Sequence, residues 1–510
     1  MLGTFTIRLR RGFMILAAVL LNGGILLGIG AILVYLNTGA DRSSILHLDT
    51  EIESVYRPHI QLGSHTNEGR PIDTAAAENL IRDYLNAWYT RNEALRYNDP
   101  LLMRDYYTDS AYAKLKRLID LNKNSEVSIQ QTTLAHSISI DFYSEDGKLA
   151  TLSDSNVEVY KQIWKKDGLQ VESKDTSNYR VVLFLEDNSW RIRHMQRTAS
   201  ERGEETKDLE GRNMANTIAG IKGVNYYPQD QPWNMFGDDF DLKVVESDFV
   251  KIREMGLNTI RIFIPYQEFG GPDVRSGHLS QLKQVMDAAE TKGIKVLLTL
   301  FDFYGNYDLA EWTLNFRHAR LIVTAFKEHP ALLAWDIKNE PDLDFESRGK
   351  KRVLAWLREL SAIVNTLDQE HPVTIGWSNA EAASLLKDEV DVVSFHYYGD
   401  TDSFRAAYQE LRISVPEKPV VLQEYGLSSY SGIWHLFSGS ETEQAAHHEA
   451  IQGAVTELQI PYLFWTLYDF PEVPQKVVGR LPWRRMPQKK YGCFDEKGDP
   501  KEAYTIIKQK

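Results

Sequence analysis

The sequence predicts an α/β protein in which a (β/α)8 barrel follows a small α+β domain and an N-terminal transmembrane helix. Three observations predict this fold class. Residues 220–510 alternate eight short apolar runs with amphipathic helical stretches, as in a barrel of parallel strands. Residues 72–198 place two helical stretches before several strand-like segments. The segment 199–219 between them is charged and poor in apolar residues, which indicates a linker.

The composition supports folded domains and excludes some classes of function. Hydrophobic residues make up 43% and aromatic residues 11% of the 510 residues, enough for substantial cores. The net charge of −13 argues against binding nucleic acid over a broad surface. Cys493 is the single cysteine, so no intramolecular disulfide can form, and no Cys/His spacing typical of zinc sites occurs. We therefore expect neither a metal nor an organic cofactor.

Residues 13–36 form an apolar run without a charge, preceded by a basic tail over residues 1–12. At about 1.5 Å per residue the run spans roughly 36 Å, enough to cross a bilayer. The arginines of the tail predict a cytoplasmic N-terminus, so the remainder would be periplasmic or extracellular. A cleaved signal peptide is the alternative, since Thr38-Gly39-Ala40 offers small residues. Its apolar region is normally only about 7–15 residues long, which favours an uncleaved anchor.

Between the anchor and the barrel we expect a stalk over residues 37–71 and the small domain over residues 72–198. Leu80, Tyr84 and Trp88 share one face of a first helix. A second helix is expected over residues 101–119, and Asp187-Asn188 is a predicted hairpin turn. Predicted strands cover residues 127–132, 138–143, 157–164, 179–185 and 190–195. This order resembles the nuclear-transport-factor-2-like cone fold, which serves many functions; a spacer and a polymer-binding module remain open.

The predicted barrel strands are short apolar runs, and Gly256 and Gly293 end the first two long helices between them. The alternative is an open doubly wound sheet, but no Gly-rich phosphate loop follows the first strand. The strands are expected at residues 221–227, 259–265, 295–301, 333–339, 373–377, 392–396, 420–424 and 462–467.

Two glutamates end strands of this barrel. Pro341 stops the fourth strand directly after Glu340, and Glu424 ends the seventh. In a closed barrel both lie at the carboxyl-terminal mouth, where active sites are found. Carboxylates about 5–5.5 Å apart are the pair that a retaining glycosidase needs. Taken alone, Glu340 is equally a loop residue that happens to follow a strand, but the repetition at Glu424 favours a shared site.

The motifs around these glutamates resemble the clan of retaining barrel glycoside hydrolases. They are Asn339-Glu340-Pro341, the second glutamate, His396-Tyr397-Tyr398 and Trp465. Within the clan, residues 221–508 most resemble cellulase-like family 5, with some likeness to family 2 catalytic barrels. The resemblance implies that Glu340 is the general acid/base and Glu424 the nucleophile.

The resemblance also implies a set of substrate-binding residues. Asn339 would hold the sugar 2-hydroxyl, Trp465 would form an aromatic floor, and Arg261 would support the nucleophile. A barrel-interior ion pair is the alternative for Arg261. Asp302 belongs to the expected set although it departs from the family pattern, since many family 5 enzymes carry a histidine at that place. Four further residues complete the expected set, namely Asn225, His396, Tyr398 and Trp483.

Two electrostatic expectations follow. Arg261 and Tyr398 should keep Glu424 ionised, while Glu340 needs a raised pKa to hold its proton. Strand alternation places Asp336 and Lys338 beneath Glu340, where we expect an internal ion pair.

The expected function is an endo-acting, membrane-anchored glycoside hydrolase that cleaves a β-linked, β-glucan-like polysaccharide. A transglycosylase beside a polysaccharide synthase or export complex, and a non-catalytic polysaccharide receptor, are the alternatives. Long loops should bring aromatic residues to the catalytic face, although such residues also pack loops onto barrels. Nearby cations leave room for an acidic polymer or are solvated loop charges. The aromatic residues are Trp233, Tyr304, Tyr307, Trp312 and Trp483; the cations are Arg484, Arg485, Lys489 and Lys490.

Overall fold

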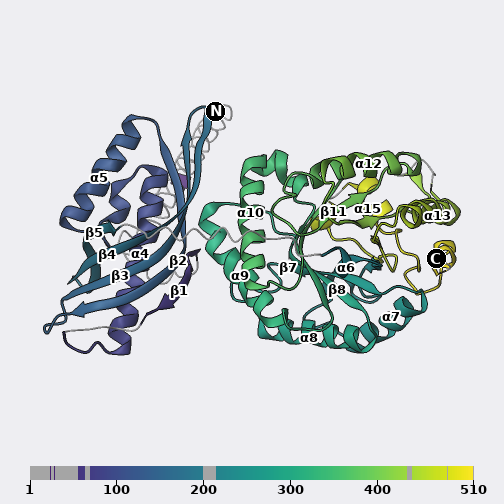
Figure 1. Cartoon of the computed structure of the whole chain (residues 1–510), viewed down its shortest axis with the longest axis horizontal. Helices are drawn as coiled ribbons and strands as arrows, with labels where there is room; N and C mark the ends of the chain where they lie inside the picture. The colour runs from purple at the N-terminus through teal and green to yellow at the C-terminus, as the bar shows by residue number, and fades with distance from the viewer. Residues whose placement is uncertain are drawn as a thin grey trace, which may run out of the picture.

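The computed structural model describes residues 23–24, 28, 55–63, 69–198, 214–433, 439–478 and 481–508. These residues form two domains side by side, a small α+β domain and a barrel (Figure 1). The predicted basic tail, almost all of the predicted transmembrane segment 13–36, and most of the linker lie outside the described residues. Within the described ranges, no helix combines the length and the apolar character needed to cross a membrane.

The small domain packs two helices against a five-stranded sheet in which the strands follow chain order. The helices are α4 (Thr74–Tyr97) and α5 (Asp109–Asn124), with a 3-10 turn, η1 (Pro100–Met103), between them. The strands are β1 (His59–Leu62), β2 (Ser128–Tyr143), β3 (Leu149–Lys165), β4 (Gly168–Glu186) and β5 (Ser189–Thr198). Asp73 caps α4 by accepting a hydrogen bond from the Ala76 N–H. The apolar face predicted for this helix is buried, as expected.

Three sequence expectations for this domain meet different outcomes. The hairpin turn at Asp187-Asn188 is confirmed, with positive φ at both residues. The strands expected at residues 127–132 and 138–143 are one long strand, β2, whose register shifts at Ala135. The stalk prediction is wrong for residues 59–62, which form β1 and pair in parallel with β2. The reason is that Tyr56, just before β1, is buried in the core of the domain.

The predicted (β/α)8 barrel is confirmed: eight parallel strands close on themselves through the pairing of β13 with β6. Two of the predicted strands, β7 and β10, have the bounds that the sequence indicated. The strands are β6 (Lys222–Asn225), β7 (Thr259–Pro265), β8 (Lys295–Asp302), β9 (Leu332–Asn339), β10 (Val373–Trp377), β11 (Val393–Tyr397), β12 (Val420–Tyr425) and β13 (Tyr462–Phe464).

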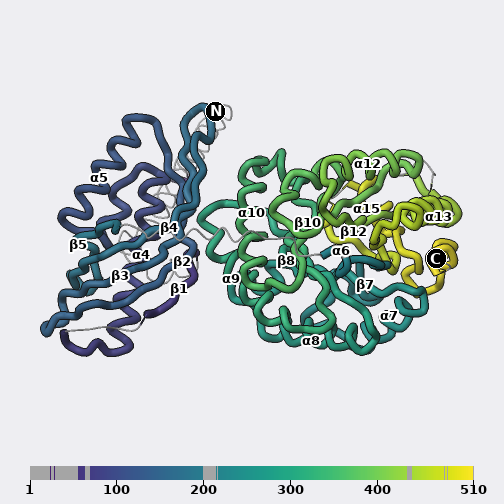
Figure 2. Tube along the Cα trace, in the orientation of Figure 1, coloured from purple at the N-terminus to yellow at the C-terminus, as the bar shows by residue number. Residues whose placement is uncertain are grey.

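Helices surround the barrel strands as a ring, and the chain can be followed around it from teal to yellow in Figure 2. Gly256 and Gly293 follow the first two long helices with positive φ, as predicted for C-cap glycines. The long helices are α7 (Leu242–Glu254), α8 (Ser276–Thr291), α9 (Trp312–Phe326), α10 (Lys350–Leu367), α12 (Phe404–Ser414) and α13 (Glu441–Glu457). Shorter ones are α6 (Ala215–Ile218), α11 (Ala380–Ala383), α14 (Gln475–Val478), α15 (Pro482–Gln488) and α16 (Glu502–Lys508).

The small domain docks on the outside of the ring, against α9 and α10 (Figure 1). Tyr160 of β3 packs on Trp312 of α9 with ring centroids 4.5 Å apart. Arg96 forms two hydrogen bonds to Asp308, of 3.0 and 2.8 Å. Trp312 is therefore an interface residue, and its expected place on the catalytic face is wrong.

Candidate active site

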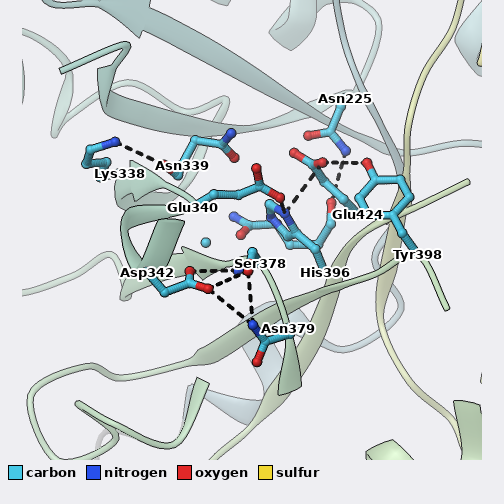
Figure 3. Close-up of polar contacts among 12 residues, drawn as sticks. Asn225, Lys338, Asn339, Glu340, Asp342, Ser378, Asn379, His396, Tyr398 and Glu424 are labelled. Carbon is cyan, nitrogen blue, oxygen red and sulfur yellow. Dashed lines mark hydrogen bonds and ion pairs between the residues drawn. The ribbon is translucent and has the colours of Figure 1, made fainter. Parts of the chain in front are cut away.

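Glu340 stands at the carboxyl end of β9 in a left-handed conformation, with φ 45° and ψ 51°. Its N–H donates to the Gly376 carbonyl at 2.7 Å. Asp342 accepts a hydrogen bond of 3.0 Å from the Ser378 N–H, which ties the turn to β10 (Figure 3). A positive φ at a non-glycine residue costs energy and persists where surrounding contacts enforce it. Here those contacts leave the Glu340 side chain about a quarter exposed, at 25%.

Glu424 lies on β12 and is almost fully buried. One of its oxygens accepts a 2.6 Å hydrogen bond from Nη1 of Arg261. The other accepts a 2.7 Å bond from the Tyr398 hydroxyl, the contact that the sequence led us to expect. Burial, followed by the charge of Glu424, raises the pKa of Tyr398 well above its ordinary value, so the phenol stays a donor. The carboxylate is thus held in one orientation from both sides.

His396 lies between the two glutamates (Figure 3). Its Nδ1 is 2.9 Å from Oε1 of Glu340 and 3.5 Å from Oε2 of Glu424. One oxygen from each carboxylate and one imidazole nitrogen all lie within 4.8 Å of one another. The imidazole ring is fully buried, so His396 contacts the two carboxylates and has no exposed surface for a sugar.

The pKa values of this cluster run opposite to the expected order. Burial raises the pKa of Glu340, but the hydrogen bond and charge of His396 outweigh burial and lower it below the ordinary value. Burial raises the pKa of Glu424, and the attraction of His396 and Arg261 does not reverse that shift. Burial lowers the pKa of His396, yet the two carboxylates raise it overall. The reversed order has two causes, the burial of Glu424 and the hydrogen bond that His396 makes to Glu340.

Arg261 extends from β7 through the barrel mouth and is fully buried. Besides Glu424, its Nη2 donates to Asp336 at 2.6 Å and to Asn339 at 2.9 Å. Its Nε donates to Thr299 at 3.0 Å. The two roles considered for Arg261 are therefore both present. It contacts Glu424, the expected nucleophile, and it forms an ion pair inside the barrel with Asp336. One guanidinium joins side chains from β8, β9 and β12.

The ion pair expected between Asp336 and Lys338 is absent. Asp336 is taken by Arg261 and by the Gly376 N–H, at 2.6 and 2.9 Å. The Lys338 ammonium instead lies 3.5 Å from the Asp344 carboxylate. A guanidinium already anchored on β7 offers two aligned donors to Asp336, which a single ammonium cannot match.

The two asparagines at the barrel mouth differ in which side-chain groups remain available for hydrogen bonds. The side-chain oxygen of Asn339 accepts a hydrogen bond from Arg261, which directs the NH2 group of Asn339 away from the guanidinium. Asn225 is fully buried, accepts from Arg261 at 3.2 Å, and donates to the backbone carbonyls of Gln423 and Phe464. Asn225 therefore positions the guanidinium, and its expected contact with substrate has no free group to make it.

Gly376 is a site residue that the sequence reasoning missed. A Cβ atom there would lie 2.7 Å from Nη2 of Arg261 and 2.6 Å from Oε1 of Gln423. No other residue fits between them without displacing one. The available signal was a glycine inside a predicted strand, which often marks a close approach.

An aromatic floor lies beside the carboxylates. Trp465 packs near Tyr227, Phe263 and Phe470, and Trp233 joins them on Tyr227 with centroids 4.9 Å apart. The buried Nε1 of Trp465 has no hydrogen-bond partner among the described residues. An apolar surface of this kind suits the face of a sugar ring.

Other predicted aromatic contacts do not reach a cleft. Tyr304 and Tyr307 are buried against Trp356, so they pack the loop onto the barrel, as the alternative reading allowed. Trp483 lies on α15 and is 52% exposed, and its contact with substrate remains a prediction.

Of the cations expected near the site, Arg485 forms an ion pair with Glu472 at 2.5 Å. Lys489 and Lys490 also have carboxylate partners, on Glu472 and on Asp469 and Glu496.

Asp302 ends β8 and is buried beside the floor. Burial raises its pKa to about 7, against the attraction of Lys338 and Arg261. Its Oδ2 has no hydrogen-bond partner within the described part of the chain. It is thus a carboxyl that titrates near neutrality at the edge of the site.

Glu340, His396 and Glu424 also present three possible metal ligands. Arg261 lies 2.6 Å from Glu424 and already supplies the positive charge that a metal ion would bring. The His396 nitrogen nearest the carboxylates is occupied by its bond to Glu340. The chemistry that the cluster supports is proton transfer and nucleophilic attack by its own carboxylates.

A parallel eight-stranded barrel with two glutamates and an aromatic floor at one mouth defines a glycosidase-type enzyme. The sequence profile of Cellulase (glycosyl hydrolase family 5) matches residues 216–471. The chain belongs to this family and is a glycoside hydrolase, which confirms the family resemblance expected from the motifs.

Relatives of known activity are distant. Human beta-glucuronidase is 24% identical over 299 residues, which cover 54% of this chain and 41% of that protein. Mannan endo-1,4-beta-mannosidase 3 of Solanum lycopersicum is 24% identical over 305 residues, 50% of this chain and 72% of that protein. A GH5_18 structure from Streptomyces cattleya in complex with Manb1-4GlcNAc has a TM-score of 0.45 and 18% identity, covering 56% of this chain and 79% of that chain. A family 2 beta-galacturonidase from Eisenbergiella tayi bound to galacturonate has a TM-score of 0.45 and 16% identity, covering 75% and 72%.

Proposed function

We propose that this enzyme cleaves a β-linked polysaccharide with retention of anomeric configuration, with Glu424 as nucleophile and Glu340 as acid/base. The observation that carries the proposal is the separation of the glutamates, which have oxygens within 4.8 Å of each other. Retaining enzymes hold their carboxyl groups about 5–5.5 Å apart, whereas inverting enzymes need about 6.5–9.5 Å to admit water. The short separation favours direct attack by one carboxylate.

In the first step Glu424 attacks the anomeric carbon while Glu340 gives a proton to the leaving oxygen. A covalent glycosyl ester forms, and the glycosidic bond breaks. Arg261 and Tyr398, at 2.6 and 2.7 Å, orient the attacking carboxylate. The free NH2 of Asn339 donates to the sugar 2-hydroxyl. In the second step Glu340 removes a proton from water, which attacks the ester and releases Glu424, and that proton returns through Glu340 to His396.

His396 supplies the proton that Glu340 delivers. In the resting site the imidazole is the group with the raised pKa and Glu340 the group with the lowered one. Their 2.9 Å hydrogen bond is a direct path for that proton. As Glu424 forms the ester and loses its charge, the imidazole loses one of the carboxylates that stabilise its charged form. Proton transfer towards Glu340 and the leaving oxygen then becomes easier.

The substrate class we propose is a polymer bound at several sugar positions, cleaved within the chain. The partly exposed rings of Trp465 and Trp233, which pack against the buried Tyr227, support this, because neighbouring aromatic faces accommodate consecutive sugar rings. Mannan and glucuronide chemistry among the relatives makes β-glucans, β-mannans and β-glucuronide-containing chains the first polymers to test.

The test uses the full chain in detergent with defined oligosaccharides of each polymer, varied in length, and follows the anomeric product by NMR. Retention and faster cleavage of longer chains are expected. Glu340→Gln and Glu424→Gln should each lower turnover by about three or more orders of magnitude, while the exposed Glu417→Gln should not. An inverted product overturns the mechanism, and wild-type turnover in either active-site variant overturns the assignment. Products longer than the substrate would show that a sugar, rather than water, is the acceptor.

We also propose that residues 13–36 anchor the enzyme in a membrane, with the barrel outside the cytoplasm near a polysaccharide synthase or exporter. The uncharged run and the arginines at positions 8, 10 and 11 support this orientation. A phosphatase reporter fused after Lys510 should be active, and a cytoplasm-dependent fluorescent reporter should be dark. The opposite pair of results reverses the topology.

A further inference from the structure

The small domain contains a half-open cavity of about 310 Å³ between its two helices and the face of its sheet. This volume lies at the lower end of the range typical of ligand sites, about 300–1,000 Å³, and suits one or two sugar rings. Its walls come from α4, α5 and strands β2 to β5, so it is separate from the barrel. The lining includes Trp88, Arg91, Lys114, Lys161, Tyr179 and Arg197.

The cavity is positively charged in an acidic protein. Arg91, Lys114, Lys161 and Arg197 line it, with Asp175 as the single acidic lining residue. Lys161 lies 3.7 Å from Asp175, so that pair is partly neutralised. The other three cations have no ion-pair partner among the described residues, while the chain as a whole carries −13. Unpaired cations gathered at one cavity favour an anionic ligand.

Arg91 is held in place by packing rather than by a carboxylate. Its guanidinium lies 4.7 Å from the centroid of the Trp88 ring, which is itself fully buried and edge-on to Tyr179. The buried Nε of Arg91 has no hydrogen-bond partner in the part of the chain that the structure describes. A guanidinium held on an aromatic ring, without a carboxylate partner among the described residues, is positioned to bind a planar anion before any ligand arrives.

The remaining wall is apolar and only partly covered. Leu115, Tyr179 and Met195 line the cavity and are neither buried nor fully exposed. Gln131 adds one polar group, fixed by its 2.8 Å hydrogen bond to Asn92. A bare inorganic anion needs no such surface, whereas the C–H face of a sugar ring does.

We propose that this cavity binds a carboxylate-bearing sugar, a hexuronate unit of a polysaccharide. The carboxylate lies against Arg91, with Lys114 and Arg197 adding attraction at the rim, and the ring packs on Tyr179. The site requires no reaction in the barrel. It would hold an acidic chain on the enzyme whether or not the barrel cleaves that chain.

The experiment is calorimetric titration of the full chain in detergent with trigalacturonic acid. Cellotriose is the neutral match in size, and inorganic phosphate tests anions without a sugar. The key variant is Arg91→Met, which keeps an unbranched stem on Trp88 and removes the charge. Arg180→Met is the matched control, since Arg180 is exposed on β4 and points away from its neighbour Tyr179. A double variant, Lys114→Met with Arg197→Met, changes exposed rim residues and keeps the test valid if Arg91→Met does not fold.

The triuronate should bind, and raising the salt from about 50 to about 300 mM should weaken it. Arg91→Met should weaken it by about 10- to 100-fold, the double variant should also weaken it, and Arg180→Met should leave it unchanged. Cellotriose or phosphate binding as tightly as the triuronate overturns the proposal. So does the absence of triuronate binding, or an unchanged affinity in both cavity variants. Titrating Glu424→Gln in parallel separates this site from the barrel, because cavity binding should survive that change.

Discussion

Replacing Arg261 by methionine should lower both the free energy of unfolding and the catalytic rate. The side chain is fully buried and lies 2.6 Å from both Asp336 and Glu424. Arg261→Met keeps a long apolar stem but removes the charge, so two buried carboxylates lose the guanidinium that they share. Breaking a buried ion pair in this way costs about 3–5 kcal/mol, since one partner remains charged and desolvated.

The expected loss for Arg261→Met is about 4 kcal/mol, near the middle of that range, because the remaining partners of the two carboxylates soften it. Asp336 keeps hydrogen bonds from Thr299 and Gly376, at 2.7 and 2.9 Å. Glu424 keeps its bond from Tyr398. At about 2 °C per kcal/mol for a large domain, the midpoint of thermal unfolding should fall by about 8 °C.

Activity should change in a pH-dependent way. Burial raises the pKa of Glu424, and the charge of Arg261 opposes that shift. Without the guanidinium the pKa rises further, so the nucleophile ionises only at higher pH. The acidic limb of kcat/KM should therefore move to higher pH, and kcat should fall by about 100- to 1,000-fold.

Scanning calorimetry and a pH profile of kcat/KM measure both effects. The control is Arg275→Met, an exposed arginine before α8 with no ion pair among the described residues, which should change stability by less than about 0.5 kcal/mol. If Arg261→Met unfolds within about 2 °C of the wild type, or keeps the acidic limb in place, the reasoning is refuted.

Three further changes test neighbouring groups. Gly376→Ala should displace the Arg261 guanidinium, which lies 2.7 Å from the added Cβ, and should reduce kcat more than KM in steady-state assays; unchanged kinetics would contradict this packing. His396→Gln removes a cation that lowers the pKa of Glu424, so the acidic limb of the pH profile should move to higher pH, and it removes the proton donor to Glu340, so the maximum rate should fall as well; an acidic limb that stays in place, with a uniform loss at every pH, would mean a purely structural role. The folded-state pKa of Asp302 is raised from 3.8 to about 7, so its stabilising contribution is full below 3.8 and lost as pH rises through 7. Asp302→Asn lacks this loss, so urea unfolding should show it gaining on the wild type between pH 4 and 8, by at most about 4 kcal/mol; a constant difference would refute the raised pKa.

The strands and the glutamates were predictable because their signals are local. The bounds of β7 and β10 follow from short apolar runs, with Pro265 as the last residue of β7 and Pro372 directly before β10. Glu340 and Glu424 follow from their place at strand ends, since every parallel strand of a closed barrel ends at the same mouth.

What the sequence did not reveal depends on contacts between distant segments. β1 pairs His59 with Ala135, and no local pattern announces a partner so far along the chain. The shift of register at Ala135 breaks the alternation of β2, which made one strand look like two. Tyr304 was predicted on the catalytic face, but it packs on Trp356. The sequence pattern of an aromatic residue in a loop is the same whether the ring binds a sugar or packs against the barrel.

The same long-range contacts explain why the electrostatic order was predicted wrongly. A histidine after a strand was expected to face substrate, and its true neighbours depend on side-chain directions on β9, β11 and β12. Once His396 is placed 2.9 Å from Glu340, the lowered pKa of that carboxyl follows. The identity of the residues was available from the sequence, but their mutual distances were not.

The docking of the small domain on α9 and α10 has a consequence for how the protein unfolds. Tyr160 and Leu134 of the small domain belong to the same apolar cluster as Trp312 and the barrel strands. Removing the small domain would expose that surface to water, so a truncated chain that starts at residue 214 should be less soluble than the longer one. In the intact chain the shared cluster links both domains into one melting unit, and a single calorimetric transition is expected.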